Sequence, residues 1–183
     1  MRRWLALLAV VSAAAASAQP GHGFVLESGT LTYRVVHKLH QVVGTSRELE
    51  GRAVIQDDGT GRVQVRARVA SFDSGNANRD ANMREATHEP MHPYASLKGT
   101  LSGIRRPLTG PVEVSMPATV ELNGEKQPAT IPVSLRPEGS RIRVTFSFPI
   151  SLESFKVERP ELFFVKVDDR AEISGDLVFA ESQ

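Results

Sequence analysis

The stretch RVQVRARV, residues 62–69, followed by SFDSGNANRD, residues 71–80, decides the fold class of this chain. In the first stretch, valine and alanine alternate with arginine and glutamine, the pattern of a β-strand with one face in water. The second stretch is polar and opens the one substantial helix that the sequence predicts, around residues 78–87, with Asn76 or Asn78 as its N-cap. The alternation indicates a β-barrel or sandwich, and the helix marks where it is interrupted.

The same period of two recurs along most of the chain. Asn123-Gly124 is a strong hairpin dipeptide, and Glu138-Gly139-Ser140 predicts the next turn. A further helical turn is expected within residues 151–157. The segments expected to be strands are residues 31–37, 51–56, 63–69, 94–104, 112–122, 131–135, 142–150 and 171–179. About eight strands predict a mainly β protein, with an antiparallel sheet that closes or nearly closes on itself.

The first eighteen residues have the composition of a signal peptide. Arg2 and Arg3 precede an apolar run, and Ala16-Ser17-Ala18 is a small-residue cleavage signal. We therefore expect export with cleavage near Ala18, leaving residues 19–183 as a single domain of 165 residues. Neither the apolar run nor any later segment reaches the roughly 20 residues that a membrane span needs.

The charge and cysteine content of the remaining chain narrow the function classes. Of the 22 Lys and Arg, two lie in the first eighteen residues, so 20 remain against 21 Asp and Glu, a net charge of −1. This balance gives no electrostatic reason to expect nucleic acid as a partner. The chain has no cysteine, so packing has to stabilise it without disulfides. No catalytic triad, paired-carboxylate signature or phosphate-binding glycine loop stands out, and no enzyme activity is expected.

Small side chains on the expected inward face raise the question of what fills the barrel. Ala67, Ala118, Ala171, Gly175 and several valines have the inward parity. A barrel lined by small residues can hold a ligand, because an empty apolar cavity costs about 24 cal/mol per Å³. The alternative is that phenylalanines of the later strands fill the space.

The histidines suggest a second class of function. His88-Glu89-Pro90-Met91-His92 has the letters of a zinc-protease helix, H-E-x-x-H, but Pro90 is incompatible with the helical turn that this motif needs. A metal or haem site using His88 and His92, with His37 and His40, stays open as an alternative, giving a periplasmic redox or stress protein.

The order of motifs resembles the YceI-like family of periplasmic polyisoprenoid-binding proteins. Residues 31–44 resemble the family's alternating strand followed by His and Val-x-Gly, and residues 71–84 resemble its Ser-x-Asp-Thr-Gly-x-x-x-Arg-Asp-x-x-Leu-Arg stretch. Residues 92–97 stand where the family has Tyr-Pro and a strand, and residues 120–133 are similar to its hairpin. The chain departs from the family at the aromatic pair after the helix, at the hairpin histidine and at the tyrosine before proline, where it has Thr87-His88-Glu89, Asn123 and His92.

The resemblance implies an extended, lipocalin-like antiparallel barrel in the periplasm that holds a long isoprenoid lipid, such as a polyprenyl phosphate or a quinone tail. No other cofactor is expected, and a homodimer is possible. A ligand-free accessory domain is a third reading, in which the barrel would be collapsed. His37 ends a strand on the apolar parity, so its ring is a candidate contact for a lipid head group. Arg79, at the start of the expected helix, is the second candidate polar contact. The expected lining is completed by Tyr33, Val35, Val63, Val65, Val69, Val114, Met116, Val133, Val144, Phe146, Phe148, Ile173 and Leu177.

Overall fold

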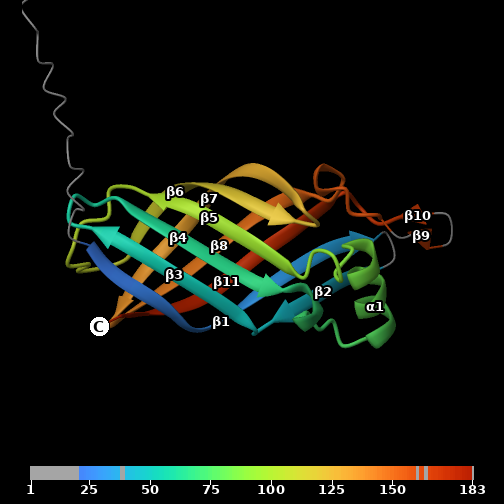
Figure 1. Cartoon of the computed structure of the whole chain (residues 1–183), viewed down its shortest axis with the longest axis horizontal. Helices are drawn as coiled ribbons and strands as arrows, with labels where there is room; N and C mark the ends of the chain where they lie inside the picture. The colour runs from blue at the N-terminus through green and yellow to red at the C-terminus, as the bar shows by residue number, and fades with distance from the viewer. Residues whose placement is uncertain (1–20, 38–39, 160, 163–164, 183) are drawn as a thin grey trace, which may run out of the picture.

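The computed structural model describes residues 21–37, 40–159, 161–162 and 165–182. The expected signal peptide, residues 1–18, therefore lies outside the described residues. Figure 1 shows the described chain as a barrel of long strands with one α-helix at an end. The elements are β1 (Gly21–His37), β2 (His40–Ser46), β3 (Leu49–Gln56), β4 (Gly61–Arg68), the 3₁₀ turn η1 (Val69–Ser71), α1 (Ala77–Ala86), β5 (Tyr94–Leu101), β6 (Val112–Leu122), β7 (Glu125–Glu138), β8 (Arg141–Ser151), the 3₁₀ turn η2 (Glu153–Phe155), β9 (Glu161–Leu162), β10 (Val165–Lys166) and β11 (Arg170–Glu181).

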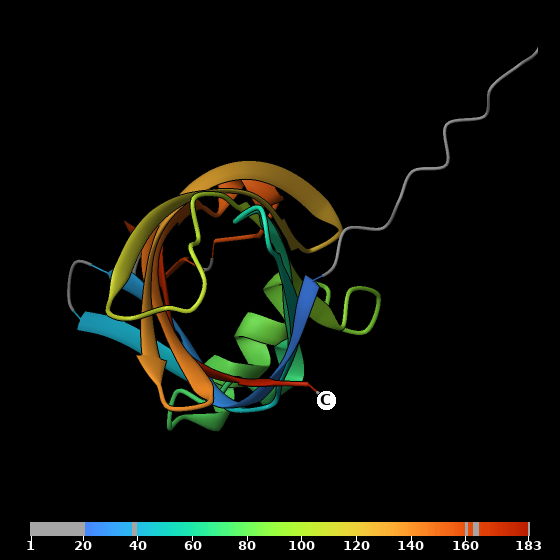
Figure 2. The ribbon, with the colours of Figure 1, turned by 90° about the vertical axis from the view of Figure 1, so that its left-hand side faces the viewer.

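The strands form a closed antiparallel barrel. The hydrogen-bonded order is β11-β8-β7-β6-β5-β4-β3-β1-β2, and β1 also pairs with β11, so eight strands complete the ring and β2 extends it. Figure 2 shows this ring viewed along the barrel. The prediction of a mainly β, lipocalin-like barrel with one helix is confirmed.

The first strands differ from the prediction. β1 is 17 residues long, and its first part pairs with β3 while its second part pairs with β2. The sequence HQVVGTS of β2 has no clear alternation and was not expected to be a strand; its pairing with β1, through Val35 and Val42 for example, stabilises it. The short β9–β10 pair was also not expected, since two-residue strands carry no periodicity.

The later strands follow the prediction more closely. Strand β6 has the predicted bounds, and Asn123 and Gly124 form the predicted hairpin turn with φ of 52° and 76°. Strand β7 begins earlier than expected, at Glu125, because it continues directly from this turn. Strand β5 ends at Leu101 rather than at residue 104, since Gly103 adopts a φ of +75° and turns the chain.

The helix α1 forms where the sequence predicts it. The Asn76 side chain accepts hydrogen bonds from the backbone N–H groups of Asn78 and Arg79, each at 3.1 Å, so Asn76 is the N-cap. Asp80 in the first turn is favourable for the helix dipole, and its Oδ1 accepts a hydrogen bond from the N–H of Ser74 at 3.1 Å. The loop before the helix is thereby held against the first turn. No helix in the described part of the chain has the length and hydropathy needed to cross a bilayer.

The hydrophobic core fills the half of the barrel away from α1. Ile131, Leu177 and Met116 are at most 4% exposed in this half. Ile104, which follows β5, is 1% exposed, and its N–H donates to the carbonyl of Gly59 in the β3–β4 turn at 3.0 Å. One half of the barrel is therefore closed by its own side chains.

Candidate functional site

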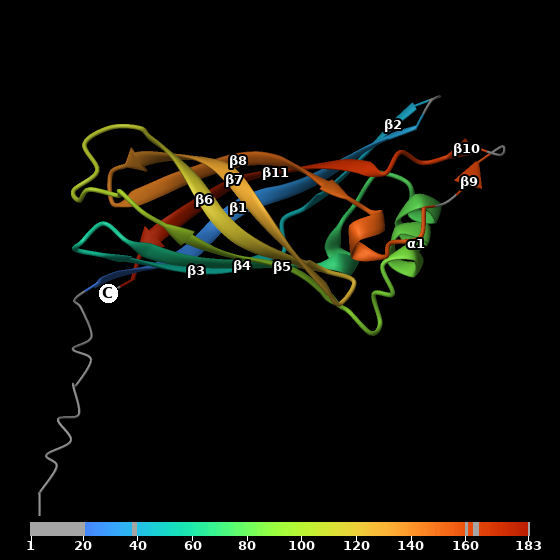
Figure 3. The ribbon, with the colours of Figure 1, turned by 90° about the horizontal axis from the view of Figure 1, so that it is seen from above.

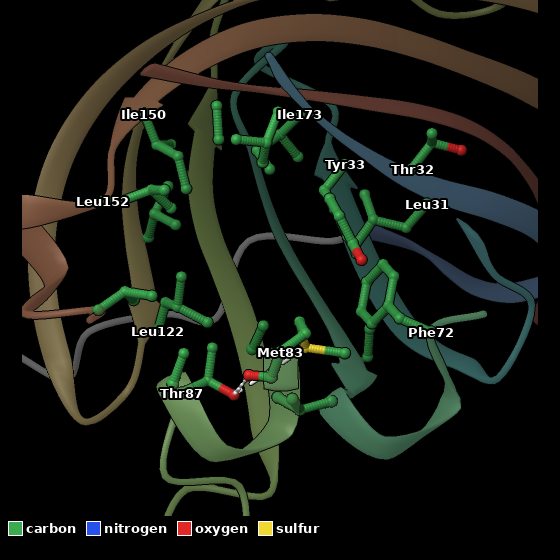
Figure 4. Close-up of a pocket in the computed structure, with 18 of the residues that line it drawn as sticks. Leu31, Thr32, Tyr33, Phe72, Met83, Thr87, Leu122, Ile150, Leu152 and Ile173 are labelled. Atoms are coloured by element: carbon green, nitrogen blue, oxygen red, sulfur yellow. Dashed lines mark hydrogen bonds between the residues drawn. The ribbon is translucent and has the colours of Figure 1, made fainter. Parts of the chain in front are cut away.

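A cavity of about 370 Å³ lies in the half of the barrel next to α1. Figure 3 shows α1 and the β9–β10 pair at this end of the molecule. In the close-up, Tyr33, Leu31 and Phe72 form one wall, and Ile150, Leu152 and Leu122 face them (Figure 4). Met83 of α1 and Thr87, the C-cap residue of this helix, lie at the end of the space. The cavity is therefore mainly apolar, with polar groups concentrated near the helix.

Two aromatic rings build one wall of the cavity. The centroids of Tyr33 and Phe72 are 5.6 Å apart with the ring planes at 50°. Tyr33 pairs with Gly44 across β1 and β2, and a Cβ on Gly44 would overlap the Tyr33 ring. Glycine at this position therefore lets the tyrosine ring lie close against the strand.

A second ring is accommodated in the same way on the other side. Phe146 pairs with Gly175 across β8 and β11, and a Cβ on Gly175 would overlap the Phe146 ring. Phe148 follows on the same face, with its ring centroid 6.1 Å from that of Phe146. The interior remains open at this level because one aromatic ring rests over a residue without a side chain.

Arg79 supplies a cation to the polar end of the cavity. Its Nη2 donates to the carbonyl of Ser74 at 2.9 Å, as expected for an arginine that braces the loop. Its Nε is buried and has no hydrogen-bond partner, and the same is true of the Ser74 hydroxyl. Buried polar atoms without partners are uncommon in folded proteins, so Arg79, which lines the cavity, is a candidate to bind a polar part of a ligand.

The ionisation of Tyr33 reflects this environment. Burial raises the pKa of the Tyr33 hydroxyl above its usual value, the Asp80 carboxylate raises it further, and the Arg79 guanidinium opposes the shift. The hydroxyl is therefore neutral at ordinary pH and able to donate a hydrogen bond.

The structure divides the predicted lining residues into two groups. Eight lie around the cavity: Tyr33, Val35, Val65, Val69, Arg79, Phe146, Phe148 and Ile173. Six belong instead to the packed core or its edge: Val63, Val114, Met116, Val133, Val144 and Leu177. Period-two alternation identifies the inward face of a strand but not the height of a residue along the barrel, so the sequence could not separate the two groups. His37 pairs with His40 through the backbone of the β1–β2 hairpin, and the side chains of both lie outside the described residues.

Several lining residues were not predicted. Leu31, Leu122 and Ile150 have the inward parity of their strands, so the alternation could have identified them. Phe72 directly follows η1, Met83 lies in α1 and Leu152 directly precedes η2, and these segments carry no strand periodicity. Their positions follow only from how these segments pack over the barrel end.

The histidines of the His88–His92 segment have structural contacts. Nδ1 of His88 donates to Oδ1 of Asn123 at 2.9 Å, and the His92 ring lies against Gly124, where a Cβ would approach it to 2.6 Å. Within the described residues, no three His, Cys, Asp or Glu side chains lie close enough together to hold a metal ion. These contacts do not favour the alternative metal site.

An antiparallel eight-stranded barrel with an apolar cavity at one end defines the lipocalin-like class. The YceI-like domain model matches residues 19–179, and the chain belongs to this family. No curated protein is significantly similar to it in sequence.

Solved structures share the fold at low sequence identity. A polyisoprenoid binding domain from Saccharophagus degradans, implicated in plant cell wall breakdown, is 17% identical with a TM-score of 0.70, over 87% of this chain and 98% of that one. BcnA of Burkholderia cenocepacia is 18% identical with a TM-score of 0.67, over 82% and 95% of the two chains. The YCEI protein of Campylobacter jejuni is 13% identical with a TM-score of 0.52, over 67% and 72%.

Proposed function

We propose that this protein binds an isoprenoid or other long-chain lipid without catalysing a reaction on it. The observation that carries the proposal is the apolar cavity beside α1, in a chain of the YceI-like family. The polyisoprenoid-binding description of the Saccharophagus relative supports the isoprenoid class.

The walls of the cavity provide the free energy for binding. Burial of apolar surface contributes about 25 cal/mol per Å², or about 0.8 kcal/mol for each methylene group. A hydrocarbon tail against Phe146, Phe148 and Ile173 would gain this contribution, less the cost of ordering the chain. The tail therefore supplies most of the affinity.

The polar end of the cavity sets the preference among lipids. Nε of Arg79 and the Tyr33 hydroxyl offer hydrogen-bond donors to a phosphate or a quinone carbonyl. A polyprenyl phosphate gains a charge-assisted hydrogen bond from Arg79, whereas a quinone accepts neutral ones. Both head groups can accept hydrogen bonds here, and the phosphate should bind more tightly because its negative charge is attracted to the Arg79 guanidinium.

The proposal includes a periplasmic location. Its support is the signal-peptide composition of residues 1–18. Fractionation of the native host with an antibody to the protein tests it, because a cleaved form beginning near Gln19 is expected in the periplasmic fraction. A full-length form confined to the cytoplasm would contradict it.

Native mass spectrometry of protein purified from its own host tests the binding proposal. A bound mass that organic extraction identifies as a lipid is expected, and the same spectrum reports the oligomeric state and so tests the possible homodimer. The variant Val65→Trp places a large side chain in the cavity and should abolish binding. Gln64→Trp is the matched control, because Gln64 is an exposed neighbour on β4. Equal lipid capture by Val65→Trp and the unaltered protein would contradict this site.

A further inference from the structure

The cavity ends at a floor inside the barrel. On β5, Leu97 lines the cavity, whereas Gly99, the next inward residue, lies beneath the Met116 side chain, and a Cβ on Gly99 would meet the Met116 sulfur. Met116 is 4% exposed and Ile131, its pairing partner on β7, is 0% exposed. On β11, Ile173 lines the cavity, while Leu177 is 1% exposed in the core. The hollow part of the barrel therefore stops at the level of Met116.

The length of the hollow part follows from the strand that runs along it. Along β8 the cavity extends from Phe146 to the end of the strand at Ser151, and Leu152 lines it just beyond. The five residue steps from Phe146 to Ser151, at about 3.3 Å each, cover about 17 Å of strand, or about 13 Å along the axis for a strand tilt of about 40°. A stretched isoprene unit contributes four chain bonds of about 1.5 Å in zigzag, so it spans about 5 Å. The cavity is therefore about three isoprene units long.

The positions of the polar groups determine which end of a lipid reaches the floor. Arg79 and Asn82 of α1, with its C-cap residue Thr87, line the cavity at its outer end. The floor is made of Met116, Ile131 and their apolar neighbours. A lipid with one polar end would therefore place its head near α1 and the tip of its tail against Met116.

We propose that the cavity limits tail length: it encloses about three isoprene units, and any further units of a longer lipid remain outside it. This inference depends on the proposed function, since it assumes that a lipid tail is the occupant. It follows that affinity rises with tail length up to the farnesyl chain and is then nearly constant. Methylene groups left in water contribute no burial.

Titration calorimetry with geranyl, farnesyl and geranylgeranyl monophosphates, below their micelle concentrations, tests this inference. We expect the Kd to fall at least tenfold from geranyl to farnesyl and to change less than twofold from farnesyl to geranylgeranyl. A further tenfold tightening at geranylgeranyl would overturn the length limit while supporting lipid binding. No binding by any of the three would instead overturn the proposed function itself.

A variant of the floor gives an independent test. Met116→Ala removes the side chain over Gly99 and should tighten geranylgeranyl monophosphate at least fivefold, with little change for geranyl monophosphate. Leu135→Ala is the matched control, because it removes the same number of heavy atoms from a core residue that is 3% exposed and does not line the cavity. Circular dichroism checks that both variants fold, and if either fails to fold, the tail-length series on the unaltered protein decides alone. A folded Met116→Ala protein that shows no gain for the longer tail would contradict the assignment of Met116 to the floor.

Discussion

The ring of Phe146 lies directly over Gly175 of the neighbouring strand, in space that any other residue at position 175 would occupy with its Cβ. Both residues are on the inward face of the barrel, and Phe146 lines the cavity while Gly175 is buried beneath it. The glycine allows the ring to rest against the wall. Its small size thus keeps the cavity open at the level where the core begins.

Gly175→Ala should reduce lipid affinity with only a modest loss of stability. The backbone at position 175 is not in the positive-φ region, so alanine is conformationally acceptable there. The new Cβ would overlap the far end of the Phe146 ring, which must turn into the cavity. We expect at least a tenfold weaker Kd for a bound prenyl monophosphate, with a stability loss of about 1–3 kcal/mol from overpacking. Calorimetry and thermal unfolding measure the two effects.

The double variant Gly175→Ala with Phe146→Leu provides the control for this prediction. Leucine lacks the ring atoms that overlap, so it should restore most of the affinity. Affinity that stays low in the double variant would show that the effect of position 175 does not act through Phe146.

Arg79→Gln should weaken binding of a prenyl monophosphate more than binding of the matching prenyl alcohol. Arg79 provides a buried Nε without a partner, and a phosphate would accept a charge-assisted hydrogen bond from it. We expect at least a tenfold loss for the phosphate and less than a threefold loss for the alcohol. The bond from Arg79 to the Ser74 carbonyl is also lost, and this general effect applies to both ligands. Equal losses of affinity for the phosphate and the alcohol would indicate that Arg79 only stabilises the loop before α1.

Asn123→Gly should destabilise the fold by about 2–3 kcal/mol. Glycine keeps the positive φ of the β6–β7 turn, so the variant removes only the side chain. The Asn123 Nδ2 donates to the carbonyls of Phe155 and Lys156, both at 3.0 Å, and its Oδ1 accepts from His88. Each lost bond contributes about 1 kcal/mol, and the buried Phe155 carbonyl loses this partner.

Gln127→Ala is the comparison for Asn123→Gly in chemical denaturation. Gln127 makes one exposed hydrogen bond to the same 3₁₀ turn, from its Nε2 to the Ser154 carbonyl at 2.8 Å, so its loss should cost less than about 1 kcal/mol. Similar changes in the free energy of unfolding for the two variants would argue against Asn123 as the residue that joins the hairpin to η2.

Tyr33 should titrate above pH 10. The chain has two tyrosines, so in the Tyr94→Phe variant the near-ultraviolet tyrosinate band reports Tyr33 alone. Burial and the Asp80 carboxylate raise the pKa of Tyr33 in the folded protein. Its contribution to stability is therefore complete below about pH 10 and is lost as pH rises from there through the higher folded-state pKa, because the unfolded state ionises first. A folded-state midpoint at or below 10 would contradict the burial of this hydroxyl.

The strands of this protein could be predicted because their signal is local. Each strand has one wet face and one apolar face, so the alternation in residues 62–69 or 112–122 identifies both the element and its inward side. The Asn123-Gly124 turn and the Asn76 cap are likewise short-range, since each depends on the conformation or hydrogen bonds of adjacent residues. Strand β2 was not predicted, because its extended conformation is stabilised by pairing with β1 and not by a pattern in its own residues.

The cavity could be predicted only in part. Val65 and Val63 are both inward residues of β4, two positions apart, and both belong to the packed interior, yet only Val65 also lines the cavity. Nothing in the alternation distinguishes them, since the difference is their height in the barrel. Phe72 and Met83 reach the cavity from segments without strand periodicity, so only the folded arrangement places them there.

By itself, the sequence determined an antiparallel sheet that closes or nearly closes on itself, the inward face of most strands, a helix around residues 78–87 and the resemblance to the YceI-like family. The tertiary structure alone decided which half of the barrel is filled and which is hollow. Strand patterns depend on neighbours two residues apart, whereas the filling of the interior depends on side chains such as Met116 and Gly99, which meet from different strands. Whether the barrel is filled at a given level depends on the total volume of the side chains that meet there from all strands, and the period of two along one strand does not determine that total.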